Sequence, residues 1–273
     1  LLPPFTENPF MKFGIDRLRS PSEEMAGPQI LSPQQEKSFF AACSPWQHDI
    51  FTTLASYGLR VGELTHLLIE DVDFDAGGFY IRSKPEMYWN VKTRRIRCLP
   101  FTAQSKSLFQ RLIDKRKAGF VFLEHPYADG DRQPASSFVT DRALRTHLQK
   151  MAADAHSSDP NISEKDIFRA VTKFCRSLGQ ISEKRVRDEF MSITEAIGCP
   201  ELTRVHDLRH LFSSRAQELG MNPLLVQELL GHASLDMTRR YTHLGLETKR
   251  TAMEQMTKRN ASSGHGKKQK KAR

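Results

Sequence analysis

Residues 206–210 read HDLRH, residues 229–234 read LLGHAS and residues 240–244 read RYTHL. These strings decide which fold to expect, because they fall at the ends of segments with helical character. The segments 206–219 and 223–230 have that character, and Gly220 between them is suited to end the first as a C′ cap. The last third of the chain is therefore predicted to be a series of short helices whose ends carry histidine, arginine and tyrosine.

Helices are also predicted through most of the chain before this region. Ser32-Pro33 and Ser44-Pro45 each combine an N-cap serine, proline at the first helical position and glutamine three residues after the cap, which together signal a helix start. They predict helices through Cys43 and from about 46 to 57, with Gly58 ending the second, and then a short helix carrying Glu63, Leu64, Leu67 and Leu68. Further helices are expected at about 103–117, 138–154, 164–178, 183–197 and 246–257.

Two segments between these helices have an extended pattern. Residues 79–82 follow the pair Gly77-Gly78, and residues 91–99 form a second candidate strand. The polar stretch 83–90 between them is expected to be a mobile hairpin tip. The predicted fold class is therefore mainly α with a small antiparallel β-sheet (α+β).

The composition excludes several classes of protein. The chain has 273 residues, of which 38% are hydrophobic and 27% charged. No apolar run approaches the roughly 20 residues that a transmembrane helix needs, so no membrane span is expected. No C-x-x-C pair occurs, which argues against a disulfide framework or a structural zinc site and favours a reduced, intracellular protein; the four cysteines are Cys43, Cys98, Cys175 and Cys199.

The formal net charge of +9 is concentrated at the C-terminus. Residues 257–273 hold seven lysines and arginines and no acid, which leaves a net +2 on the rest of the chain. We interpret this segment as a basic, disordered tail, residues 1–31 as a linker or arm rich in proline, glycine and serine, and residues 32–256 as the folded domain. The start without methionine indicates a fragment of a longer protein.

Two further strings carry candidate functional residues. Residues 57–64 read YGLRVGEL and place Arg60 in a turn between two helices, with Glu63 one turn further on. Residues 92–100 read KTRRIRCLP on the second predicted strand. Each string alone has an ordinary explanation, such as a salt bridge between Arg60 and Glu63 or a solvated basic strand face.

Taken together with the C-terminal strings, these residues fit metal-free cleavage of a phosphodiester. Arginine guanidinium groups can bind two non-bridging phosphate oxygens as charge builds in the transition state. A tyrosine phenol can attack phosphorus and keep the bond energy in a phosphotyrosyl ester. A lysine can protonate the leaving 5′ oxygen, and a histidine can accept or relay the proton of the phenol.

The motifs resemble those of the tyrosine recombinases, also called phage-type integrases. H-x-x-R at 206–209, L-L-G-H at 229–232 and R-Y-T-H-L at 240–244 occur in the order and at the intervals of that family, and residues 58–64 resemble its first motif. The resemblance covers most of residues 32–256 and implies the tyrosine recombinase catalytic fold. The interval between Pro100 and His206 is longer than the family's, so residues 155–200 are interpreted as a helical insertion. It packs on the body, or instead serves a partner or regulates access to the site.

The resemblance implies a role for each matching residue. Arg60 and Arg209 would be the phosphate clamp, and Tyr241 would be the nucleophile. His206 would be the general base or an orienting group, and His232 would be a second contact to the phosphate or to the tyrosine.

Glu63 resembles the acid that braces these side chains in the family. Lys92 matches the family's K-x-x-x-x-R/K-x-x-P strand pattern and would be the general acid, with Lys84 near the same hairpin as the alternative. The arginines on the same strand are expected to contact the DNA backbone; they are Arg94, Arg95 and Arg97.

The resemblance implies a site-specific recombinase that cleaves and rejoins DNA, in integration or excision, without cofactor or metal. Its partners would be double-stranded DNA at specific sites and further copies of the chain, as a homo-tetramer on DNA and a monomer when free. The helix at 246–257 would dock on the neighbouring subunit, or else pack in cis. The protein would lie in the cytoplasm with the bacterial nucleoid, or in the nucleus of a eukaryote. The family's N-terminal clamp domain is missing here, which predicts reduced DNA affinity.

Other activities compete with this interpretation. A type IB topoisomerase uses a similar residue set to relax DNA, but the first motif and LLGH favour a recombinase. A zinc hydrolase could use His206 and His210, but Asp207 stands where such enzymes have glutamate and Arg209 would repel the metal. A DNA-binding module without catalysis is disfavoured because every reactive position is occupied.

Overall fold

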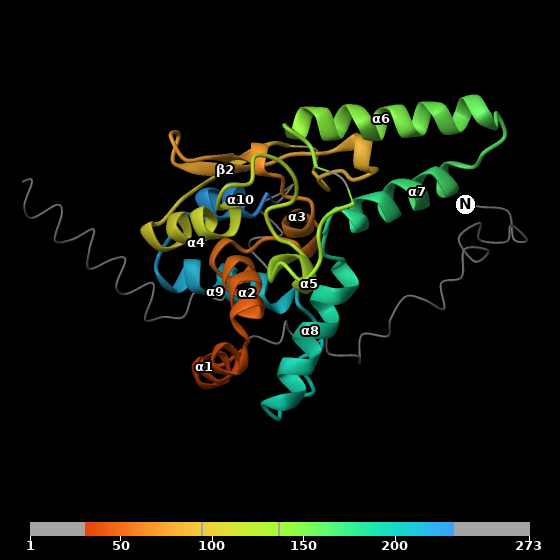
Figure 1. Cartoon of the computed structure of the whole chain (residues 1–273). Helices are drawn as coiled ribbons and strands as arrows, with labels where there is room; N and C mark the ends of the chain where they lie inside the picture. Colours follow the sequence, from red (N-terminus) through yellow and green to blue (C-terminus); the bar gives the residue numbers. More distant parts are fainter. Residues whose placement is uncertain (1–30, 94, 136, 232–273) are drawn as a thin grey trace, which may run out of the picture.

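The computed structural model describes residues 31–93, 95–135 and 137–231, and Figure 1 shows how they are arranged. Several predictions fall outside these residues and are not tested by the structure. They concern the arm at 1–31 (except Leu31), the helix at 246–257, the tail at 257–273, and the candidate residues Arg94, His232 and Tyr241.

The first two helices begin where the sequence predicts. Helix α1 (Pro33–Ala42) and helix α2 (Pro45–Tyr57) each start with a capping box, on Ser32 and Ser44 respectively. Gly58 ends α2 in the left-handed conformation at φ 58°. Helix α3 (Val61–Thr65) is shorter than predicted, because the chain leaves the helix before Leu67 and Leu68.

A small antiparallel sheet follows, as predicted. The short 3₁₀ helix η3 (Ile69–Asp71) leads into β1 (Val72–Asp73), and β2 (Gly78–Ile81) pairs with β1 and with β3 (Arg97–Pro100). In the second pair Phe79 lies opposite Leu99, and both are fully buried. Strand β3 begins only at Arg97, so the prediction that the strand starts at residue 91 is wrong and Lys92 lies in a turn.

The connection between β2 and β3 is packed, which contradicts the prediction of a mobile hairpin tip. It contains the 3₁₀ helix η4 (Pro85–Met87) and a bridge between Lys84 and Trp89. Met87 and Lys84 are 4% and 2% exposed. The segment folds inward because the Met87 side chain joins an apolar core and the Lys84 ammonium finds a buried carboxylate, Asp71, at 2.8 Å.

The rest of the described chain is helical. Most of the predicted helices are confirmed, and Gly220 follows α9 with φ 70°, as its predicted capping role requires. The short α5 was not predicted. The helices are α4 (Ala103–Ile113), α5 (His125–Ala128), α6 (Asp141–Ser158), α7 (Glu164–Ser177), α8 (Glu183–Ala196), α9 (Asp207–Glu218) and α10 (Pro223–Leu230).

The main core joins the sheet to the surrounding helices. Its largest fully buried side chains are phenylalanines, and the rings of Phe39 and Phe51 meet edge to face at 5.3 Å between centroids. Helix α8 belongs to this core through Val186, Phe190 and Ile193. Within the described residues, no helix has both the length and the apolar character needed to cross a membrane.

A second, smaller core holds α6 and α7 together as a hairpin that projects from the body in Figure 1. Leu144 and Leu148 of α6 face Ile167 and Val171 of α7, and Met87 of η4 closes the cluster. The side of α7 that carries Ile167, Val171 and Cys175 is therefore buried, while Phe168 is 44% exposed. Residues 155–200 do not form one appended unit, however, because α7 pairs with α6 while α8 packs in the main core.

Candidate active site

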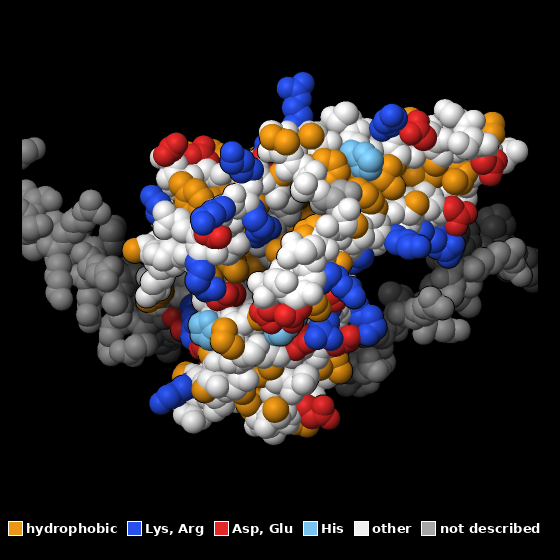
Figure 2. Space-filling model, viewed as in Figure 1, with side chains coloured by type: hydrophobic (Ala, Val, Ile, Leu, Met, Phe, Trp, Pro, Cys, Tyr) orange, Lys and Arg blue, Asp and Glu red, His pale blue; other side chains and the backbone are white. Residues whose placement is uncertain are grey.

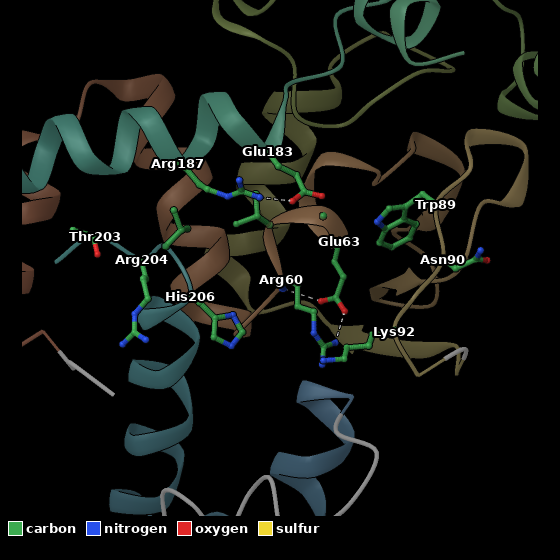
Figure 3. A pocket seen from close by; sticks show the side chains of 13 residues that line it. Arg60, Glu63, Trp89, Asn90, Lys92, Glu183, Arg187, Thr203, Arg204 and His206 are labelled. Carbon is green, nitrogen blue, oxygen red and sulfur yellow. Dashed lines mark hydrogen bonds and ion pairs between the residues drawn. The ribbon is translucent and has the colours of Figure 1, made fainter. Parts of the chain in front are cut away.

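A hollow of about 460 Å³ opens where α3, the start of α8, the β2–β3 connection and the segment before α9 meet. Figure 3 shows that Arg60, Lys92 and His206 are turned toward the same space from three different parts of the chain. Arg187 and Arg204 also line the hollow, and Glu63 lies at its wall. The structure therefore brings together residues that are separated by nearly 150 positions in the sequence.

Glu63 holds Arg60 in place at the start of α3. The Arg60 backbone N–H donates to Glu63 Oε2 at 2.9 Å, and Arg60 Nη1 donates to Glu63 Oε1 at 2.9 Å. One carboxylate thus caps the helix and binds the side chain of the capping residue. The Glu63 side chain is 1% exposed and that of Arg60 is 21% exposed, so the arginine keeps an open side toward the hollow.

Arg97 is the second partner of Glu63, which corrects its prediction as a DNA-backbone contact. Its Nη1 and Nη2 donate to the two Glu63 carboxylate oxygens at 3.1 and 2.6 Å, and its Nε donates to the Leu229 carbonyl at 2.9 Å. Side chains alternate across a strand, and Arg97 lies on the buried side of β3 with Leu99. Arg97 is only 7% exposed, and its donors bind the protein.

These contacts keep the Glu63 carboxyl ionised. Burial alone would raise the pKa of Glu63, but hydrogen bonding to Arg97 and the charges of Arg97, Arg60 and Arg209 outweigh it, so the pKa is lowered. A buried carboxylate with a low pKa stays charged at neutral pH. It is therefore a permanent anchor for the arginines around it.

Arg209 lies near the start of α9, is 2% exposed and does not line the hollow, but its charge acts on Glu63 and His206. Its Nη1 and Nη2 donate to the carbonyls of Gly58 and Leu230 at 2.5 Å each, which joins the ends of α2 and α10. Gly58 permits this close approach, since a Cβ there would lie 2.5 Å from Leu230 and 2.9 Å from Phe212. The positive φ of Gly58 favours glycine as well.

The end of α10 is fixed beside the Glu63 cluster. Arg97 and Arg209 bind the Leu229 and Leu230 carbonyls at the C-terminus of the helix, where positive charge is favourable. Gly231 has φ 62°, and a Cβ there would lie 2.8 Å from Arg97 Nη1. The residue that directly precedes His232 in the chain is thus held next to the site.

His206 is the described histidine that lines the hollow. Partial burial, followed by the nearby charges of His210, Arg209 and Arg60, lowers the pKa of His206 to about 4. Its ring is therefore neutral at pH 7 and has a lone pair available to accept a proton or hydrogen bond. The His206 and His210 rings lie 4.8 Å apart, and the described residues contain no group of three potential ligands that could hold a metal ion.

The structure distinguishes the two candidate lysines. Lys92 is exposed and lines the hollow with Arg60. The Lys84 side chain is 3% exposed and pairs with Asp71 at 2.8 Å, and its pKa is lowered by burial against the opposing effect of Asp71. Lys84 also lies 5.8 Å from the centre of the Trp89 ring. Of the two lysines, only Lys92 is open to a ligand in the hollow.

Several side chains that line the hollow were not predicted from the sequence, among them Arg204, Arg187 and Trp89. Arg204 is two residues before His206 and pairs with Asp207 at 3.3 Å, so its closeness in sequence could have identified it. Arg187 pairs with Glu183 at 2.9 Å on α8, and Trp89 lies on the connection that was expected to be mobile. Nothing in the local sequence around these two residues indicates that they meet the site. Arg95 is exposed on the β2–β3 connection, outside the hollow.

Solved integrases and recombinases share this fold. The structure superposes on the Tn1549 transposon integrase, solved with circular intermediate DNA, with a TM-score of 0.57 and 20% identity over 86% of this chain and 68% of that one. It superposes on a XerA recombinase with a TM-score of 0.51 and 20% identity over 86% and 66% of the two chains.

Residues 29–247 match the model of the phage integrase family, and the chain belongs to that family. It is 27% identical to the tyrosine recombinase XerC of Pelobacter propionicus over 202 residues, which cover 72% of this chain and 47% of the relative. It is 25% identical to the tyrosine recombinase XerA of Pyrococcus horikoshii over 251 residues, or 90% of this chain and 69% of the relative. The chain thus spans about half the length of the XerC relative.

Proposed function

We propose that this chain is the catalytic part of a site-specific DNA recombinase that cleaves and rejoins strands through a 3′-phosphotyrosyl intermediate. The observation that carries the proposal is the convergence of Arg60, Lys92 and His206 on one hollow. Membership of the phage integrase family supports the same reaction, as do relatives named tyrosine recombinases.

The arginines supply the binding of the scissile phosphate. Arg60 is held by Glu63 on one side and presents its remaining donors to the hollow. Arg209 adds buried positive charge next to the end of α10. Guanidinium groups fixed in this way stabilise the charge that builds on the non-bridging oxygens without reorganising during the reaction.

The proton transfers balance across the two halves of the reaction. The Tyr241 phenol gives up its proton, for which neutral His206 is the acceptor, and its oxygen attacks phosphorus. The bond from phosphorus to the 5′ oxygen breaks, and Lys92 donates a proton to that oxygen. His232 contacts the phosphate or the tyrosine. A 5′ hydroxyl from another strand then attacks the tyrosyl ester and gives its proton to Lys92. The bond from phosphorus to the Tyr241 oxygen breaks, and that oxygen regains its proton from His206, so neither ATP nor a metal ion is consumed.

The partners follow from this reaction. The substrate is double-stranded DNA at specific recombination sites, consistent with relatives in the family that were solved bound to DNA. Strand exchange needs two duplexes and four cuts, so the active assembly is a homo-tetramer on DNA, with the free chain a monomer. Arg94 and Arg95 are assigned contacts to the DNA backbone, because they belong to the basic string 92–97. The protein works where its DNA is, in the nucleoid of a bacterium or in a nucleus. Recombination between two DNA sites, as opposed to relaxation of supercoils alone, distinguishes this activity from that of a type IB topoisomerase. The family match does not favour a topoisomerase.

A nicked suicide substrate tests the proposal. Its cleavage releases a short fragment, so the tyrosyl adduct accumulates and is seen on a denaturing gel. Tyr241→Phe is expected to bind DNA as the parent does and to form no adduct. Tyr127→Phe, on α5 and outside the hollow, is the matched control and should form adduct normally. An adduct that persists in Tyr241→Phe would sink the assignment.

A further inference from the structure

The active-site hollow continues into a second one. A neighbouring hollow of about 340 Å³ lies between the β2–β3 connection, α7 and the start of α8. Trp89 and Glu183 line both hollows, so the two are contiguous. The second hollow leads away from Arg60 and Lys92 toward the hairpin of α6 and α7.

Basic side chains follow the same direction. Arg169, Lys173 and Arg176 recur at helical spacing over the last three turns of α7, and no acid follows Asp166 in that helix. Lys184 and Arg187 continue the series at the start of α8, with side chains 81% and 57% exposed. In Figure 2, lysine and arginine side chains gather along the side of α7 that faces α8 and over the start of α8.

These basic side chains can leave their present ion-pair partners for a new one at a small cost in free energy. Arg169 pairs with Asp166, Lys184 with Asp188 and Arg187 with Glu183, each within one turn of an exposed helix. Such surface pairs contribute about 0–1 kcal/mol each. A phosphate group competes well for them, because the cation keeps a charged partner and releases counterions from the nucleic acid.

The hairpin has the shape of an arm. It is built on its own small core, which uses the apolar side of α7 against α6 and η4 and leaves Arg169 and Lys173 exposed, while Arg176 is half-buried. Helix α7 has 14 residues, which is about 21 Å at 1.5 Å per residue. That length corresponds to roughly six base pairs of duplex at 3.4 Å each. The partner that fits a basic face of this length, continuous with a phosphate-binding hollow, is DNA.

We propose that α7 and the start of α8 form a DNA-binding arm that holds the duplex flanking the scissile phosphate, through backbone contacts of Arg169, Lys173 and Lys184. This proposal rests on the proposed function, since it extends the same substrate beyond the hollow. It assigns to the α6–α7 hairpin the task of lengthening the bound DNA segment on one side of the cut.

A charge-removal experiment on the full chain tests the arm. The arm variant carries Arg169→Gln, Lys173→Gln and Lys184→Gln, all at exposed positions. The matched control carries Lys106→Gln on α4 and Arg142→Gln and Lys150→Gln on α6, which are exposed positions outside both hollows. Both variants lose three positive charges. Affinity for a fluorescent random-sequence duplex longer than the arm is measured over a range of salt concentrations.

The arm variant is expected to bind about 10- to 100-fold more weakly at low salt, with the slope of log K against log salt reduced by about 2–3. The control should change by far less. Equal losses in both variants would overturn the proposal, because net charge alone would then explain them. Loss of only the second bound copy, with the first unchanged, would also overturn it and indicate a contact between copies. If the triple variant does not fold, Lys173→Gln and Lys184→Gln are measured singly. Failure of the proposed function would appear separately, as absence of the tyrosyl adduct.

Discussion

Two buried carboxylates in this protein each hold two cations, yet they serve different ends. Glu63 binds Arg97 and Arg60, with shortest distances of 2.6 and 2.9 Å. Asp71 binds Arg82 and Lys84 at 2.5 and 2.8 Å. Both acids are at most 2% exposed, and each also accepts a backbone N–H from the residue three positions before it.

The two carboxylates differ in the exposure of the cations that they bind. Arg60 reaches the hollow with part of its side chain open, whereas the Lys84 side chain is 3% exposed and closes against Asp71. Glu63 therefore presents a charge to a ligand, while Asp71 fastens η3 to the β2–β3 connection. A buried ion pair does not by itself mark an active site. What marks one here is a cation that is held on one side and open on the other.

The two lysines of the β2–β3 connection give the largest expected contrast. Lys92→Met should slow adduct formation by about 100-fold or more, as expected for loss of a general acid, without changing the free energy of unfolding. Lys84→Met should lower the free energy of unfolding by about 3 kcal/mol, because it leaves Asp71 short of a partner in a buried site. The measurements are single-turnover cleavage of the suicide substrate and urea unfolding. The opposite pattern would make Lys84 the acid.

The two carboxylates provide the next contrast. Glu63→Gln keeps the size of the side chain but removes the charge that anchors Arg60 and Arg97, so cleavage should slow by about 10- to 100-fold. Asp71→Asn should instead destabilise the protein by about 2–3 kcal/mol and leave the cleavage rate of the folded protein near that of the parent. Cleavage is measured below the unfolding temperature of both variants. Equal losses of cleavage rate in the two variants would contradict the different roles given to Glu63 and Asp71.

Arg97 is expected to support cleavage by holding Glu63 and the end of α10 in place, and not by contacting DNA. Arg97→Lys keeps the charge but cannot bind both Glu63 oxygens and the Leu229 carbonyl at once. The cleavage rate at saturating DNA should fall about 5- to 10-fold, an effect below 2 kcal/mol, with little change in DNA affinity. Arg95→Lys, on the same connection but exposed, is the control. Weakened DNA binding with an unchanged cleavage rate would restore Arg97 as a backbone contact.

Local signals in the sequence predicted the elements well. The caps at Ser32 and Ser44 place two helix starts, and Gly58 and Gly220 end helices as expected. These features depend on a few adjacent residues and on backbone geometry, which is why they can be predicted without the fold. The motifs around Arg60 and His206 likewise identified side chains that the structure brings to one hollow.

Partners distant in sequence could not be predicted. Arg97 reads as one of several basic residues on a strand, and only its inward register toward Glu63 shows that it is internal. The stretch 83–90 looks polar, but Lys84 is neutralised by Asp71 and Met87 enters the second core. The split of residues 155–200 between two cores also depends on which helix each apolar face meets. Each of these outcomes depends on tertiary packing, which local pattern does not encode.

The last expected effect is a pH dependence of stability that arises from His66, next to Trp89. The His66 ring stacks on Trp89 at 4.7 Å between centroids, and its Nδ1–H donates to the Gly62 carbonyl at 2.8 Å. Burial, with further contributions from the charges of Lys84 and Arg176, lowers the pKa of His66 to about 4. The unfolded chain, with an ordinary pKa near about 6.5, therefore binds more protons between these values, and stability falls as the pH drops from 7 toward 4.

His66→Gln removes this titrating group and retains a hydrogen-bond donor. The loss of unfolding free energy between pH 7 and pH 5 should then shrink by about 1–2 kcal/mol, measured by urea unfolding at the two pH values. His156→Gln, at the exposed end of α6, is the matched control and should keep the parent's pH dependence. Because the charge of Lys84 contributes to the lowered pKa of His66, Lys84→Met should raise that pKa in an NMR titration. An unchanged pKa of His66 in that variant would mean that the charge of Lys84 does not act on His66.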